Sequence, residues 1–238
     1  MTLKTTTHRY AGAALLVQSL LLLVACDAAP VANTSAPATV NVTAPVAAPQ
    51  GPERLVLAFG DSLYAGYGLE RGQSLADAVQ NRLRTSGINA TVVNAGVSGD
   101  TTAAGRQRLA FSLDNLPRKP DLVLLGLGGN DVLRQLPPAE TRANLVAMLE
   151  DLKRRDIPVL LTGMQAPPNL GPEFGKTFNA IWPDLAKRYD AELYPFILDG
   201  VIGDPTLMQG DRVHPNAAGV SRIADRIAPM VRADLAAR

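Results

Sequence analysis

Four short clusters of small and polar residues hold the side chains of this sequence that could do chemistry. They read FGDSLYAG (59–66), NAGVSGDT (94–101), GLGGND (126–131) and DRVHPN (211–216). Ser62 lies in the first cluster, directly after an apolar run. One interpretation is a strand-to-helix turn in which Asp61 or Ser62 caps the next helix. The other is a nucleophile at the carboxyl edge of a sheet, and the cluster alone leaves both open, because Gly, Asp and Ser are common turn residues.

A base for such a nucleophile would have to be His214. The only other histidine, His8, lies in an amino-terminal segment that we expect to be removed. Asp211 precedes His214 by three residues, so a single turn of chain can direct its carboxylate at the imidazole ring. Pro215 disfavours helical geometry at His214 and keeps the ring in a loop. A carboxylate that fixes the histidine tautomer and stabilises the imidazolium is what a serine-activating base requires.

The second and third clusters contain donors that could stabilise an oxyanion. Gly99 can present its backbone N–H where a side chain would obstruct the approach, and Asn130 can present its side-chain amide. Asp61 and Asp131 are interpreted as residues that hydrogen-bond to the backbone and hold their loops. A dinucleotide loop is excluded, because Asp131 stands where the third glycine would be, and the chain has no G-x-x-x-x-G-K-[ST] phosphate loop.

Composition and charge narrow the class of function. The 23 Lys and Arg residues nearly balance the 22 Asp and Glu residues, and no dense basic run occurs. The sequence therefore predicts no nucleic-acid partner. His214 is the only histidine beyond residue 8, and Cys26 is the only cysteine. We therefore expect no metal site, no organic cofactor and no intramolecular disulfide.

The amino-terminal part of the chain is expected to lie outside the folded domain. A basic start and an apolar stretch too short to span a bilayer predict a signal peptide over residues 1–25. That stretch ends in LVAC, which resembles the bacterial lipobox and predicts lipidation of Cys26; a plain secretory signal is the alternative. Residues 26–52 are then expected to form a lipidated cysteine and an Ala/Pro/Thr-rich flexible tether. The domain is expected at 53–238, anchored to the bacterial cell envelope and facing the periplasm or the exterior.

Within the expected domain, short apolar runs alternate with longer amphipathic segments. The predicted strands are 55–59, 91–94, 122–127, 159–162 and 192–196, and the predicted helices are 74–85, 102–116, 141–155, 178–189 and 216–237. This alternation predicts a three-layer α/β/α sandwich around a mostly parallel, five-stranded sheet. Ligands of such sheets bind beyond the carboxyl ends of the strands. The first three clusters follow predicted strands, so the fold would bring them together.

In this order, the four clusters resemble the signature blocks of the GDSL or SGNH hydrolase family. The matching segments are FGDSLYAG, VSGDTTAAGRQRL, LGLGGNDVLR and DRVHPNAAG, within a resemblance that covers 55–238. The sequence is most similar to the bacterial periplasmic thioesterases, arylesterases and lysophospholipases of this family. The resemblance implies a flavodoxin-like fold in which Ser62 is the nucleophile, His214 the general base, and Asp211 the group that orients the imidazole. It also implies an oxyanion hole made by the backbone N–H of Ser62, the backbone N–H of Gly99 and the side chain of Asn130.

These observations together predict a lipid-anchored, monomeric serine esterase. Its expected substrates are small esters, thioesters or lipids with a modest acyl chain, hydrolysed through an acyl-enzyme. O-deacetylation of a carbohydrate or a cell-envelope polymer would use the same residues and is the enzymatic alternative; a binding lipoprotein is the non-enzymatic one. Segments 133–138 and 166–171 are predicted to border the acyl pocket, whereas Phe178, Trp182 and Tyr189 are predicted to be core residues.

Overall fold

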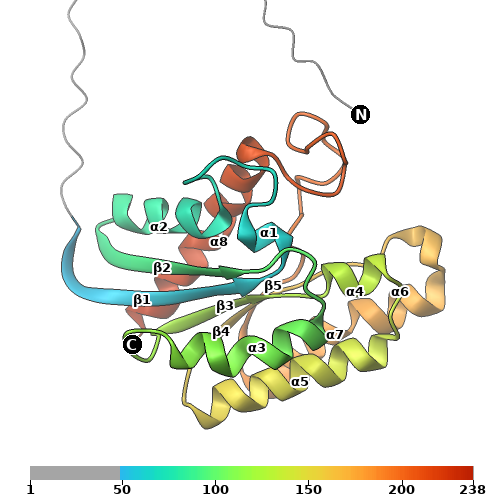
Figure 1. Cartoon of the computed structure of the whole chain (residues 1–238), viewed down its shortest axis with the longest axis horizontal. Helices are drawn as coiled ribbons and strands as arrows, with labels where there is room; N and C mark the ends of the chain where they lie inside the picture. Colours follow the sequence, from blue (N-terminus) through green and yellow to red (C-terminus); the bar gives the residue numbers. More distant parts are fainter. Residues whose placement is uncertain (1–48, 238) are drawn as a thin grey trace, which may run out of the picture. The chain divides into compact units, whose positions relative to one another are not determined.

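The apolar runs of the sequence form one parallel β-sheet in the computed structural model, which describes residues 49–237. The strands in this range are β1 (Gln50–Gly60), β2 (Ile88–Gly96), β3 (Leu122–Gly126), β4 (Val159–Thr162) and β5 (Glu192–Tyr194). Their order across the sheet is β2-β1-β3-β4-β5, and every neighbouring pair is parallel (Figure 1). The predicted signal peptide, Cys26 and nearly all of the predicted tether lie outside the described residues.

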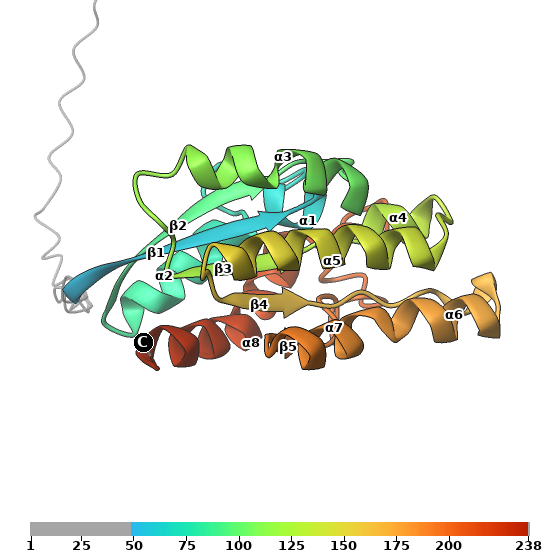
Figure 2. The same ribbon diagram turned by 90° about the horizontal axis from the view of Figure 1, so that it is seen from below.

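Helices cover both faces of this sheet (Figures 1 and 2). One face carries α2 (Leu75–Thr85) and α8 (Ala217–Ala236), and the other carries α3 (Thr102–Asp114), α5 (Pro138–Arg154) and α7 (Ile181–Tyr189). Shorter elements are α1 (Ser62–Ala65), α4 (Gly129–Leu133), α6 (Pro172–Asn179) and the 3₁₀ turn η1 (Pro168–Leu170). All five residues of β3 are buried, as a strand covered on both faces requires. The predicted α/β/α sandwich is confirmed.

Side-chain caps start three of the longer helices. Ser74 and Asp77 form a reciprocal capping box at α2, in which each side chain accepts the backbone N–H of the other residue. Thr101 caps α3 by accepting the N–H of Ala104, and Asn216 caps α8 by accepting the N–H of Gly219. The caps of α3 and α8 lie at the ends of the loops that carry the second and fourth sequence clusters, so they also fix where those loops meet the helices.

Several predicted bounds differ from those in the structure, and two differences bear on the fold. Strand β1 begins at Gln50, which pairs with Ile88, rather than at the predicted residue 55. The predicted helix 178–189 is in fact two helices, α6 and α7, that meet at Ala180. Pro183 explains the break, because it has no N–H to donate and its ring would clash with the carbonyl four residues earlier. The second helix therefore starts so that Pro183 lies in its first turn.

The core beneath the site is built around one tyrosine. Tyr64 is 1% exposed, and its hydroxyl shares a 2.8 Å hydrogen bond with Thr162 Oγ1 at the end of β4. Its ring lies where a Cβ at Gly60 or Gly126 would be, so these strand ends must be glycine. Burial raises the pKa of the Tyr64 hydroxyl. The ring thus anchors α1, the short helix that begins with Ser62, to the ends of three strands.

Two of the three aromatic residues predicted to lie in the core do so. Phe178 and Trp182 are fully buried and pack edge to face, whereas Tyr189 is only half-buried. Gly128 has a φ of +116°, and a Cβ there would meet the Trp182 ring at 2.7 Å.

Within residues 49–237, every helix is too short or too polar to span a lipid bilayer.

Candidate active site

The chain reverses its direction across the sheet at β1, and the predicted site residues gather at this point. From β1 the chain passes to β2 on one side and then to β3 on the other, which creates a crevice beyond the carboxyl ends of these strands. Ser62 follows β1, Asn130 lies in α4 after β3, and His214 lies in the loop before α8. All three line one pocket.

A serine, a histidine and an aspartate form a hydrogen-bonded series in this pocket. Ser62 Oγ lies 2.9 Å from His214 Nε2, and His214 Nδ1 lies 2.6 Å from Asp211 Oδ2. The other carboxylate oxygen, Asp211 Oδ1, accepts the backbone N–H groups of Val213 (2.9 Å) and His214 (3.0 Å). The bonds from His214 and Val213 lower the pKa of Asp211 to about 2. An ionised Asp211 accepts the Nδ1 proton, which leaves Nε2 free to accept the proton of the Ser62 hydroxyl.

The loop that presents His214 is held by its own backbone. Arg212 has a φ of 58°, and this left-handed residue turns the chain between Asp211 and the imidazole. The Gln209 N–H donates to the His214 carbonyl at 2.8 Å, which closes the turn. Gln209 Nε2 also donates to the carbonyls of Tyr67 (2.7 Å) and Pro215 (3.0 Å). The histidine loop is therefore tied to the loop that follows α1.

Tyr67 is a neighbour of the site that sequence reasoning missed. Its ring centroid lies 4.5 Å from that of His214, with the two planes tilted by 39°. The ring therefore covers one side of the imidazole. Only its position in the same cluster as Ser62 could have indicated this contact, because a lone tyrosine in a loop is not a distinctive signal.

The two predicted oxyanion donors lie in adjoining loops. Asn130 Nδ2 donates to the Asp100 carbonyl at 3.0 Å, which uses one of its two amide hydrogens and leaves the other. Gly99 lies outside the pocket lining, in the loop that this bond joins to α4. Its φ of +88° is a left-handed conformation, and a Cβ there would meet only Arg134 Nη2, at 3.8 Å. The glycine is thus required by backbone conformation rather than by crowding from protein atoms.

The two aspartates interpreted as loop-holding residues have that role. Asp61 Oδ1 accepts the N–H of Leu63 at 3.0 Å and caps α1. Asp131 accepts the N–H of Thr102 (2.8 Å) and the hydroxyls of Thr102 (2.5 Å) and Thr141 (3.1 Å). Asp61 is 2% exposed, and burial raises its pKa to about 6, against the opposing effect of the Leu63 N–H and the nearby His214.

The pocket beside Ser62 has a volume of about 200 Å³ and a largely apolar wall. Leu133 and Pro167 come from the two segments predicted to border it. The rest of the apolar wall was not predicted: Leu63, Val132, Met164, Phe196, Leu198, Ile202 and Val213. Met164 and Phe196 follow the ends of β4 and β5 closely, so the rule that ligands bind beyond strand ends could have identified them.

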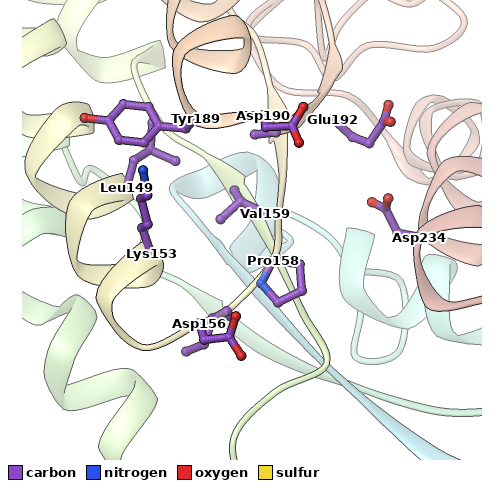
Figure 3. A pocket seen from close by; sticks show the side chains of 11 residues that line it. Leu149, Lys153, Asp156, Pro158, Val159, Tyr189, Asp190, Glu192 and Asp234 are labelled. Atoms are coloured by element: carbon purple, nitrogen blue, oxygen red, sulfur yellow. The ribbon is translucent and has the colours of Figure 1, made fainter. Parts of the chain in front are cut away.

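A larger hollow of about 350 Å³ lies at the other edge of the sheet, by the amino ends of β4 and β5 (Figure 3). Its lining includes Lys153 and the carboxylates of Asp156, Asp190, Glu192 and Asp234, but no serine or histidine. It therefore lacks both the nucleophile and the base that line the Ser62 pocket.

Throughout residues 49–237, no three His, Cys, Asp or Glu side chains are grouped so as to hold a metal ion.

Comparison with known proteins gives consistent matches. The model of the GDSL-like Lipase/Acylhydrolase family matches residues 58–222. Esterase TesA of Pseudomonas aeruginosa is 38% identical over 183 residues, which are 77% of this chain and 90% of TesA. Thioesterase 1/protease 1/lysophospholipase L1 of Escherichia coli K12 is 37% identical over 177 residues, 74% of this chain and 83% of that protein. The crystal structure of AlinE4, an SGNH-hydrolase family esterase, superposes with a TM-score of 0.67 at 54% identity, covering 77% of this chain and 97% of AlinE4.

Proposed function

The chain belongs to the GDSL-like lipase/acylhydrolase family, and on that premise we propose that Ser62, His214 and Asp211 carry out its reaction. The protein is a serine hydrolase that acts on esters, as its family and its esterase relatives show. The assignment of single residues is supported by one observation above all. A hydroxyl, an imidazole and an ionised carboxylate lie in series, at 2.9 and 2.6 Å, at the mouth of an apolar pocket.

The series accounts for each proton in the reaction. Ser62 Oγ attacks the substrate carbonyl carbon while His214 Nε2 takes the hydroxyl proton, and Asp211 stabilises the imidazolium. The carbonyl oxygen becomes an oxyanion near the N–H of Ser62, the N–H of Gly99 and the free amide hydrogen of Asn130. When the intermediate collapses, His214 gives its proton to the leaving alcohol or thiol. A water molecule then attacks the acyl-enzyme while His214 takes its proton. His214 returns this proton to Ser62 Oγ as the acid is released.

The substrate that this pocket fits best is a carboxylic ester or thioester with a modest acyl chain. The wall beside Ser62 is lined mainly by aliphatic and aromatic side chains, which favours burial of a hydrocarbon chain. A sugar ring would instead need several polar partners around it. The pocket therefore supports acyl-ester and acyl-thioester hydrolysis over the deacetylation of a carbohydrate.

The site assignment is tested by a fluorophosphonate probe followed by peptide mass spectrometry. The probe should modify the peptide that contains Ser62, and Ser62→Ala should remove both the label and ester turnover. Ser98→Ala is the matched control, because Ser98 lies in a neighbouring glycine-bearing loop and should keep both. A label on another serine, or full turnover by Ser62→Ala, would overturn the assignment. p-Nitrophenyl esters of increasing chain length, acyl-CoA, lysophospholipid and acetylated sugars then separate the substrate classes.

The location of the enzyme is a second part of the proposal. The basic start, the apolar stretch and LVAC ending at Cys26 support export and lipid anchoring of a monomer in the cell envelope. Several acyl chains hold a protein on a membrane far more stably than one. The wild-type protein should incorporate labelled palmitate and enter the detergent phase, whereas Cys26→Ser should do neither and keep esterase activity. Wild-type protein without label would refute the anchor.

A further inference from the structure

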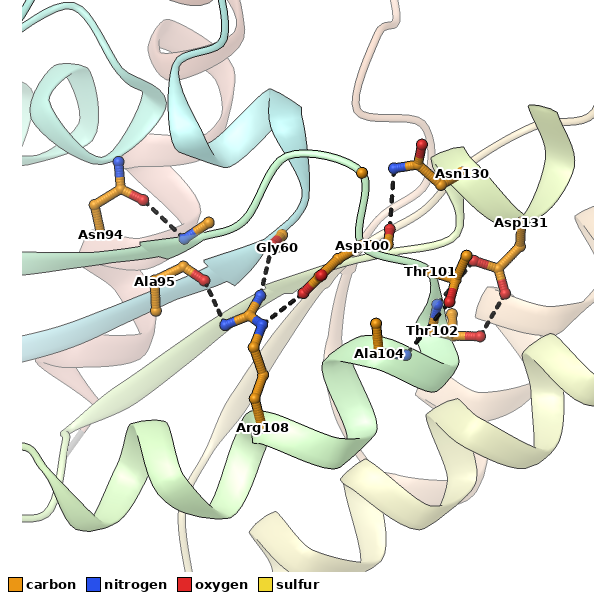
Figure 4. A network of polar contacts seen from close by, with 12 residues as sticks. Gly60, Asn94, Ala95, Asp100, Thr101, Thr102, Ala104, Arg108, Asn130 and Asp131 are labelled. Atoms are coloured by element: carbon orange, nitrogen blue, oxygen red, sulfur yellow. Dashed lines mark hydrogen bonds and ion pairs between the residues drawn. The ribbon is translucent and has the colours of Figure 1, made fainter. Parts of the chain in front are cut away.

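A single guanidinium in α3 joins the ends of two strands to the loop that carries Gly99 (Figure 4). Arg108 Nη1 and Nη2 donate to the carbonyls of Ala95 and Gly60, each at 2.8 Å, and Arg108 Nε donates to the Asp100 carboxylate at 2.5 Å. The guanidinium carbon also lies 4.0 Å from the centroid of the Phe59 ring. The Arg108 side chain is 21% exposed, so these bonds are largely shielded from water.

The two carbonyls lie where the strand pairing ends. Phe59 pairs with Ala95 and Gly60 with Gly96, and beyond them β1 and β2 have no further partners in this ladder. Arg108 supplies donors for both carbonyls at that boundary, and the Gly60 carbonyl also accepts the N–H of Val97 at 3.0 Å. The Gly60 carbonyl is two residues before Ser62, so its position determines where α1 and the serine begin. Arginine suits this place because its planar fork holds several acceptors at once, which the single ammonium of a lysine does not.

Asp100 extends the connection to the oxyanion side. Its carboxylate is held by Arg108, and its own carbonyl accepts the bond from Asn130 Nδ2 (Figure 4). On the preceding residue, the Gly99 carbonyl accepts a 2.8 Å bond from Arg134 Nη2. The orientation of the Asn130 amide therefore depends on Asp100, and the position of Asp100 depends on a charge-assisted bond, which is about twice as strong as a neutral one.

We propose that Arg108 and Asp100 are positioning residues of the hydrolase. Their ion pair fixes the strand end that precedes Ser62 relative to the loop that contains Gly99 and accepts the Asn130 amide, and it acts without touching the substrate. The inference rests on the proposed roles of those three residues. Oxyanion donors act only over a narrow range of distances, and a displacement of about 1 Å can slow an enzyme about 10²-fold. Loss of the pair should therefore lower kcat and leave KM nearly unchanged.

The test compares Arg108→Gln with a matched arginine away from the site. Arg82 is similarly buried, with a side chain that is 29% exposed. It joins α2 to α8 through Asp225 Oδ1 (2.8 Å), Ser221 Oγ (2.6 Å) and the Ser221 carbonyl (3.0 Å). Neither Arg82 nor these partners line the Ser62 pocket. Each variant is purified, and its kcat, KM and Tm are measured with one soluble p-nitrophenyl ester.

Arg108→Gln should lower kcat by about 10- to 100-fold, with KM changed by less than about threefold. Arg108→Lys should recover part of kcat, because it keeps the charge beside Asp100 but not the fork. Arg82→Gln should lower Tm comparably and leave kcat near the wild-type value. Asp100→Ala should resemble Arg108→Gln, and the double variant should be hardly slower than either, because the two act as one unit.

Several results would overturn the inference. These are a folded Arg108→Gln protein with wild-type kcat, an equal loss of kcat in Arg82→Gln, and a loss confined to KM. If Arg108→Gln does not fold, folded Asp100→Ala decides, and a wild-type kcat there refutes the pairing. If both fail to fold, wild-type kcat in Arg108→Lys would refute the need for the fork. Turnover by Ser62→Ala would refute the proposed function instead, whereas inactive Ser62→Ala beside a fully active Arg108→Gln would refute this inference alone.

Discussion

Asp61→Asn is expected to stabilise the protein at neutral pH and to slow its reaction. Asp61 is 2% exposed, and burial raises its pKa from 3.8 to about 6. Each unit of pKa corresponds to about 1.4 kcal/mol, so a rise of about two units means that the charged form costs the folded state about 3 kcal/mol. Asparagine removes the charge and can keep its oxygen on the Leu63 N–H, the bond that caps α1.

The sign of the effect follows from which state holds the proton. Between pH 3.8 and about 6 the folded protein keeps the Asp61 proton and the unfolded chain releases it. The contribution of Asp61 to the free energy of unfolding is therefore fully present below pH 3.8, falls through that interval, and is lost above it. The variant does not titrate at this position. Its advantage should be near zero at pH 4 and reach up to about 3 kcal/mol at pH 7.5, or roughly 6–12 °C in Tm.

The same change should cost activity. His214 lowers the pKa of Asp61, which means that the two groups attract when both are charged. The imidazolium forms only as Ser62 attacks, so a charged Asp61 favours the transition state over the resting enzyme. Asp61→Asn should therefore lower kcat more than it changes KM. The buried carboxylate thus lowers the stability of the folded protein and raises the rate of its reaction.

The assay is thermal and urea unfolding, followed by circular dichroism, at four values of pH from 4 to 7.5. Asp131→Asn is the matched control, because Asp131 is 1% exposed but has donors on both carboxylate oxygens. An asparagine oxygen could keep the Thr102 N–H, but its amide would then face the two threonine hydroxyls, whose charge-assisted bonds to the carboxylate would be lost, so that variant should be destabilised at every pH. A stability difference for Asp61→Asn that does not change with pH, or a less stable variant at pH 7.5, would refute the reasoning.

Three further results are expected. Ser62→Ala and His214→Ala should each abolish turnover, and the double variant should be no worse than either; losses in kcat that multiply would contradict the proton transfer. Asn130→Ala should lower kcat by about 10²–10³-fold at nearly constant KM, and a change confined to KM would make it a substrate-binding residue. Gly126→Ala should lower the free energy of unfolding by about 1–3 kcal/mol, because its Cβ would overlap the Tyr64 ring; an unchanged thermal melt would contradict this.

The regular elements could be predicted where one local signal decided them. Strand β4 has its predicted bounds, 159–162, because an apolar run is closed by a proline before it and a glycine after it. Strand β5 was predicted to reach residue 196 but ends at Tyr194, since Pro195 has no N–H for the ladder. The short helices α1 and α4 were not predicted, because helices of four and five residues carry too little periodicity to recognise.

The candidate site could likewise be predicted only in part: its reacting groups were recognisable in the sequence, and the residues that position them were not. Serine, histidine and the glycine-bearing loops stand out by type and spacing, and the fold then brings Ser62 and His214 together across 152 residues of chain. Arg108 and Tyr64 are ordinary residues in the sequence, and what they do depends on bonds to Gly60, 48 residues away, and to Thr162, 98 residues away. A local pattern cannot contain such a partner. Groups that react must have a particular chemistry and so can be recognised in a sequence, whereas groups that hold them need only the right neighbours, which exist once the sheet has formed.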